Sequence, residues 1–155
     1  MKKIFIILMI VLAGFFCKKI NTEQKSKKTE ADTFLFGVDG GLRPGNYTYF
    51  KIQEEKIYRN QPYTVGQETI LFDTNSLEHN KYLLSKELKE DFPDYLLNHP
   101  NQTFGCPNCA DQGAIHIEME HNGVLKIWDI DTEINQQPVE IRSYIKRLQQ
   151  LVSQL

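Results

Sequence analysis

Alternation of apolar and polar residues predicts two groups of strands in this chain. Residues 34–38, 47–52 and 56–59 are short runs rich in aromatic and β-branched side chains. Polar and glycine-containing segments separate them, as in an antiparallel meander. A further short edge strand is expected over residues 68–72.

The strongest strand signal lies in the last third of the chain. Ile115, Ile117 and Met119 alternate with polar residues, which is the period of a half-buried strand. Asn122 and Gly123 then form a dipeptide that favours a tight hairpin turn. Residues 124–130 are the expected partner strand.

Two segments have helical periodicity. Residues 80–91 carry helix formers, with Leu83, Leu84 and Leu88 expected on one side and Ser76 or Asn80 as the cap. A final helix is predicted from Pro138, and its apolar face contains Ile141, Ile145, Leu148, Val152 and Leu155. The predicted class is α+β: an antiparallel β-sheet, made of a meander plus a C-terminal hairpin, with two main helices packed on one face.

The first residues have a different character. Lys2 and Lys3 precede an apolar run that ends at Cys17, and the run is shorter than a membrane span. This is the pattern of a secretory signal peptide. Residues 12–17 resemble the lipobox of bacterial lipoproteins, in which the cysteine is lipidated. An ordinary signal peptide and an uncleaved anchor are the alternatives.

The expected organisation has three parts. Residues 1–16 are a lipoprotein signal peptide, residues 17–33 a flexible tether rich in Lys, Glu and Thr, and residues 34–155 a single globular domain. Lipid on Cys17 would attach the protein to a membrane of the bacterial cell envelope, facing the periplasm or the exterior. Removal of residues 1–16 takes away Lys2 and Lys3 and changes the formal net charge from −2 to −4, which argues against nucleic acid as a partner.

Cys106 and Cys109 form a C-x-x-C pair, and in an exported protein this favours a disulfide. Thiol–disulfide exchange is one alternative, although no helix is expected to begin at the pair. A zinc site with His116 and His121 is another, but these histidines are an odd number of residues apart on one strand and would point to opposite faces. Otherwise His116 beside Glu118 is expected on a solvated sheet face.

No phosphate loop, nucleophile elbow or metalloprotease motif is present, so the sequence nominates neither catalytic residues nor a cofactor. Tyrosines gather instead around the first meander, next to a glycine-rich loop. This candidate binding surface consists of Gly40, Gly41, Tyr47, Tyr49, Tyr58 and the neighbouring Tyr63. The alternative is that half of these tyrosines pack beneath the helices.

The segment from Cys106 to Gly113, followed by a strand, an Asn-Gly hairpin and a terminal helix, resembles a group of small bacterial envelope lipoproteins with a C-P-[ND]-C-A-D-Q-G motif. The resemblance implies an envelope location and no particular activity. Gly40 and Gly41 carry a second likeness, to small proteinaceous metalloprotease inhibitors. The sequence therefore favours a non-catalytic, lipid-anchored binding domain, with another envelope protein as a candidate partner.

Overall fold

The computed structural model describes residues 32–40, 45–109 and 112–155. The predicted signal peptide, Cys17, nearly all of the tether and Gly41 lie outside these residues. Within them the strands are β1 (Thr33–Asp39), β2 (Tyr47–Gln53), β3 (Lys56–Arg59), β4 (Gln102–Phe104), β5 (Ala114–His121) and β6 (Val124–Asp131). The helices are α1 (His79–Glu90), α2 (Asp94–Leu97) and α3 (Val139–Val152), with a short 3-10 helix, η2 (Ile134–Gln136), before α3.

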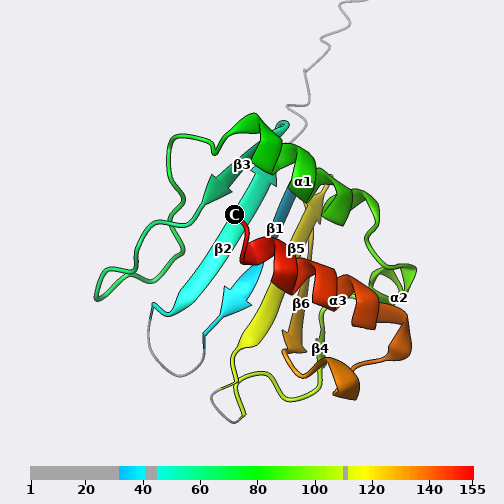
Figure 1. Ribbon diagram of the computed structural model, residues 1–155. Helices are drawn as coiled ribbons and strands as arrows, with labels where there is room; N and C mark the ends of the chain where they lie inside the picture. The colour runs from blue at the N-terminus through cyan, green and yellow to red at the C-terminus, as the bar shows by residue number, and fades with distance from the viewer. Residues whose placement is uncertain (1–31, 41–44, 110–111) are drawn as a thin grey trace, which may run out of the picture.

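The strands form one six-stranded sheet in the order β3-β2-β1-β5-β6-β4. Every neighbouring pair is antiparallel except β4 and β6, which run parallel. The meander is β1, β2 and β3, and the C-terminal hairpin is β5 and β6 (Figure 1). The predicted α+β class with a mostly antiparallel sheet is confirmed.

The register of the strands explains the position of the core. Phe36 lies opposite Phe50 on β2 and opposite Ile117 on β5, and Ile117 lies opposite Trp128 on β6. Cross-strand partners project from the same face of a sheet. All four side chains are fully buried and belong to one apolar cluster.

Helices complete this cluster. Leu88 of α1 and both Ile141 and Ile145 of α3 belong to the same buried cluster as the strand residues. Figure 1 shows α1 and α3 crossing the sheet beside one another. The face predicted for α3 is correct at Ile141, Ile145 and Leu148, while Tyr144 and Leu151 add buried side chains that were not predicted.

Trp128 connects the sheet to α2. Its indole Nε1–H lies 3.1 Å from the carbonyl oxygen of Leu96 and 2.9 Å from that of His99, and it donates to both. The ring of Phe92 packs 5.0 Å from the Trp128 ring. A buried indole therefore has its polar atom satisfied by the last turn of a short helix.

Two predictions about α1 are wrong. Leu83 and Leu84 are each 50% exposed, and the buried residues are Tyr82, Ser85 and Leu88. The aromatic ring of Tyr82 offers more apolar surface than a leucine, and its face of the helix turns toward the sheet. Neither Ser76 nor Asn80 caps the helix, which begins after Glu78 without a side-chain cap.

The strand predicted over residues 68–72 is also wrong. Only Phe72 pairs, through an isolated bridge to Asn60. The three-residue strand β4 was not predicted, because a segment of three residues shows no measurable alternation. Its pairing with β6 is a long-range contact that local sequence does not reveal.

Candidate functional site

The face of the sheet opposite the core carries the polar and aromatic residues of the central strands. Gly37 pairs with Tyr49 on one side and with His116 on the other, and His116 pairs with Asp129. These residues form one row across the sheet. The surface made by this row and its neighbours is called the tyrosine–histidine face here, and it contains Tyr47, Tyr49, Tyr58, His116, Glu118 and Asp129.

Gly37 makes the row continuous. A Cβ atom at this position would overlap with the carbonyl oxygen of Thr48 and with the ring of Tyr49. Because glycine has no side chain, the Tyr49 ring lies across β1 and approaches His116, with the two ring centroids 5.6 Å apart. An isolated glycine inside a strand often marks such a close approach, and this signal was available in the sequence.

Three of the four tyrosines in the predicted cluster contact one another. The rings of Tyr47 and Tyr49 stack with centroids 5.1 Å apart, and Tyr63 meets Tyr47 edge-on at 6.5 Å. Tyr58 lies next to Lys51, whose ammonium group is 5.8 Å from the ring. Tyr47, Tyr49 and Tyr58 therefore project from the face opposite the core.

His116 is held between two carboxylates. Its Nδ1 atom lies 2.7 Å from Oδ1 of Asp129, and its Nε2 atom lies 2.9 Å from Oε1 of Glu118. The side chain is only 19% exposed, so the expected solvated histidine is wrong. Burial alone would lower the pKa of His116, but the hydrogen bonds and charges of Asp129 and Glu118 raise that pKa to about 9.

This arrangement decides what His116 can do chemically. With a pKa of about 9 the imidazole is a cation at neutral pH, and each ring nitrogen donates its hydrogen to a carboxylate. It therefore has no free lone pair for a general base or a metal. Burial, with the nearby negative charges of Asp39 and Asp129, raises the pKa of Tyr49, so that this side chain stays a neutral phenol.

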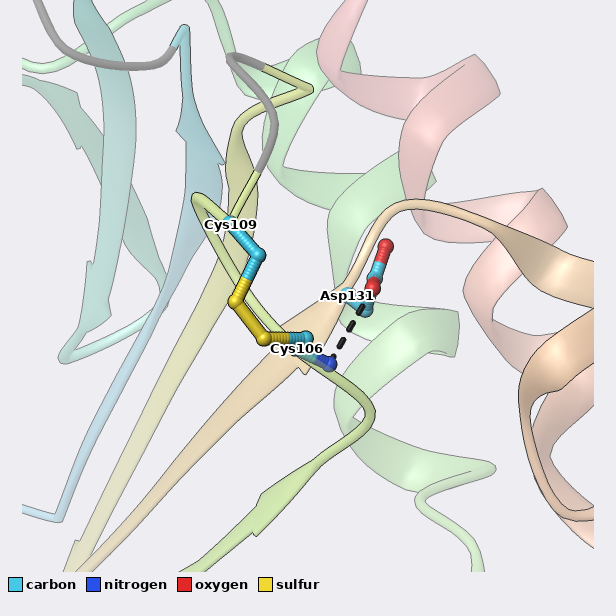
Figure 2. The surroundings of a disulfide bond; sticks show 3 residues. All are labelled: Cys106, Cys109 and Asp131. Carbon is cyan, nitrogen blue, oxygen red and sulfur yellow. Dashed lines mark hydrogen bonds between the residues drawn. A yellow bond between two sulfur atoms is a disulfide. The ribbon is translucent and has the colours of Figure 1, made fainter.

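The two cysteines lie at one end of the sheet. Cys106 and Cys109 are paired as a disulfide with their Cα atoms 5.5 Å apart. The backbone N–H of Cys106 donates to Oδ2 of the buried Asp131 at 3.1 Å (Figure 2). The N–H of Glu133 donates to the other oxygen of Asp131 at 2.9 Å. One carboxylate thus ties the cysteine loop to the segment that follows β6.

The cysteine loop adjoins the glycine-rich turn after β1. A Cβ atom on Gly113 would overlap with the carbonyl oxygen of Asp39, so the two segments touch. Gly40 exchanges hydrogen bonds with Asn46: it donates its backbone N–H to the Asn46 carbonyl and accepts from the Asn46 side chain at 2.7 Å. The cysteine loop lies at the bottom of the view in Figure 1, below β5 and β4.

The four residues of the alternative zinc site are not brought together. Each cysteine bonds the other, His116 engages Asp129 and Glu118, and His121 lies 2.8 Å from Asp32 at the far end of β5. Within residues 32–40, 45–109 and 112–155, no group of three His, Cys, Asp or Glu side chains could hold a metal ion.

The opposite end of the sheet contains an open groove of about 680 Å³, which the sequence analysis did not anticipate. It lies between α1, the β2–β3 turn and the β5–β6 turn, and its lining includes Lys86, Glu90, Asp32 and His121. Lys86 pairs with Glu90 at 3.2 Å, and His121 pairs with Asp32. Glu54, Glu55 and Lys89 complete the charged lining, so acidic and basic groups are mixed in this groove.

No protein-family model matches this chain, and no curated protein matches its sequence. None of the helices in the described part of the chain is long and apolar enough to cross a membrane.

Proposed function

We propose that this chain is a lipid-anchored protein of the bacterial cell envelope, and that its domain is a non-catalytic interaction module. The tyrosine–histidine face is the proposed contact surface, and another envelope protein is the proposed partner. The observation that carries the proposal is an unbroken series of ring contacts, from Tyr63 to Tyr47, from Tyr47 to Tyr49 and from Tyr49 to His116.

The tyrosine side chains of this face are well suited to binding a protein. Tyrosine supplies a large amphipathic contact area with few rotatable bonds, so little conformational entropy is lost when a partner is bound. Here the rings are already in contact with one another and supported by a sheet, which lowers the entropy loss further. Tyr47, Tyr58 and Tyr63 are partly exposed, so part of each side chain is accessible to a partner.

The same side chains are poorly suited to catalysis. His116 is a cation with both nitrogens engaged, and Tyr49 is a buried neutral phenol. Neither is a nucleophile or a base at neutral pH. The disulfide follows strand β4 and leads toward β5, so its cysteines lack the helix N-terminus that lowers the thiol pKa in redox enzymes.

Membrane attachment is supported by the sequence of the leader. A basic start, a short apolar run and Cys17 fit export followed by lipidation. Replacing Cys17 with serine should move the mature protein from the membrane fraction to the soluble envelope fraction. Retention of the Cys17→Ser chain in the membrane fraction would contradict the lipid anchor.

The binding surface is tested by photo-crosslinking in intact cells. A benzophenone amino acid replaces Tyr47 in one version of the full chain and Leu83, which is half exposed on α1, in the matched control. We expect a protein adduct of one defined mass from position 47 and none from position 83. Equal labelling from both positions, or none from position 47, would reject the tyrosine–histidine face as the contact surface.

A further inference from the structure

The first described residues lie against the β5–β6 turn. Asp32 contacts His121 through Oδ2 and Nδ1 at 2.8 Å, and Thr33 pairs with Glu120. The chain before Asp32, including Cys17, is therefore connected to the domain at the end of the sheet that carries this turn. Asp39 and its partner Ala114 mark the opposite end of the sheet, where the cysteine loop lies (Figure 1).

Two consecutive apolar residues are exposed at this turn. Val124 is 59% exposed and Leu125 is 46% exposed, directly after the Asn122-Gly123 turn. Val124 pairs with His121 and Leu125 with Glu120, and successive residues of a strand project to opposite faces. Apolar surface is therefore presented on both faces of the hairpin tip, which is defined here as residues 121–125.

We propose that the hairpin tip is a lipid-contacting site, at which Val124 and Leu125 enter the interfacial region of the bilayer that holds the Cys17 lipid. The inference rests on the lipid anchor of the proposed function. Fourteen residues lie between Cys17 and Asp32, so the span from one to the other reaches about 50 Å when fully extended. This limit keeps the domain near the bilayer, and the hairpin tip is at the end where the connection enters.

The charges around the hairpin tip define the kind of membrane surface it fits. Glu54 and Glu55 are exposed in the β2–β3 turn at the same end of the sheet. Lys86 and Lys89 line the groove beside them, so the mixed charges at this end give no preference for an anionic surface, and the apolar tip is indifferent to headgroup charge. The contact is therefore expected with zwitterionic lipid and should depend little on salt, because apolar burial and not ion pairing drives it.

The test places a nitroxide label at Val124 in the full lipidated chain, bound to phosphatidylcholine vesicles. The matched control carries the label at Val139, which is 71% exposed at the start of α3. Both positions are exposed, so the label should leave the fold intact, and the circular dichroism spectrum checks this. The measured quantity is the accessibility of the label to oxygen relative to a water-soluble nickel complex.

We expect the ratio of oxygen to nickel accessibility to rise at position 124 on vesicle binding and to stay at its aqueous value at position 139. Aqueous values at both positions, on protein that floats with the vesicles, would overturn the hairpin-tip contact while leaving the anchor intact. Failure of the lipidated chain to float with vesicles would overturn the anchor and this inference with it. Lipid contact at both positions would also overturn it, because the tip would not be specific.

Discussion

The Nδ1 atom of His116 lies 2.7 Å from Oδ1 of Asp129, directly across the β5–β6 pair. The other ring nitrogen lies 2.9 Å from Glu118 on the same strand. A histidine enclosed in this way is a fixed positive charge on the face of the sheet opposite the core. It also links three strands, because the Tyr49 ring on β2 packs against it across β1.

The free energy of unfolding should depend on pH because His116 titrates at a different pH in the folded and unfolded states. Its folded pKa of about 9 exceeds the unfolded value of about 6.5, so the stabilisation is complete below the unfolded pKa and is lost as pH rises through the folded one. Between those limits the free energy of unfolding should fall by about 1 kcal/mol per pH unit. Urea unfolding at several pH values from 6 to 9 measures this slope.

The variant His116→Gln should lose that slope and about 2 kcal/mol of stability at pH 6, because the two carboxylates lose a charged partner. His121→Gln is the matched control, since its side chain is 67% exposed and pairs only at the end of the sheet. It should keep the slope. An unchanged slope in His116→Gln would show that another group titrates.

Gly37→Ala should be strongly destabilising. The added methyl group meets the Thr48 carbonyl and the Tyr49 ring, so either the β1–β2 pairing or the ring must shift. The expected loss is about 2–3 kcal/mol, typical of overpacking beside backbone. Gly66→Ala is the control: its methyl group meets nothing within 4 Å, and only the left-handed backbone costs about 1 kcal/mol. Equal denaturation midpoints for the two variants would contradict the packing of Tyr49 over Gly37.

Asp131→Ala should destabilise the protein more than Asp131→Asn. The buried carboxylate accepts hydrogen bonds from the backbones of Cys106 and Glu133, one on each oxygen. Alanine leaves both donors unpaired, at a cost of about 3 kcal/mol, whereas the asparagine oxygen can still accept one of them. Chemical denaturation of both variants measures the difference, and the opposite order would refute the role assigned to Asp131.

Loss of the disulfide should lower the free energy of unfolding but leave the packing of the core unchanged. The Cys106–Cys109 bond closes a very short loop, for which chain entropy gives about 2 kcal/mol. The double variant Cys106→Ser, Cys109→Ser should therefore unfold at lower denaturant but keep the near-ultraviolet dichroism of the buried Trp128. Loss of that dichroism in the folded baseline would show that the loop holds the core together.

Much of the fold could be predicted because its signals are local. The Asn122-Gly123 dipeptide adopts left-handed angles at both residues, with φ of 53° and 74°, as a tight hairpin turn requires. The alternation at Ile115 and Ile117 identified which face of β5 is buried. The turn before β3 was also predicted, from its polar composition: Glu54 and Glu55 adopt left-handed angles there, with φ of 51° and 58°, although glutamate carries no specific signal for them.

The candidate site was only partly predictable. The tyrosines of the first meander were identified from composition, and Cys106 and Cys109 from their spacing. His116 was assigned to a solvated face, because its burial depends on Asp129 and Tyr49, which lie on other strands. The exposed fraction of a residue depends on neighbours that are distant in sequence. The sequence alone does not show which residues become those neighbours.

The sequence by itself determined the α+β class, the two antiparallel units and the C-terminal helix, because turn chemistry and hydrophobic period act over a few residues. Only the tertiary structure decided which face of α1 is buried, that β4 pairs parallel to β6, and that His116 is a cation between two carboxylates. These features depend on which elements become neighbours. That arrangement is determined by the burial of apolar surface over the whole domain, which no short segment specifies.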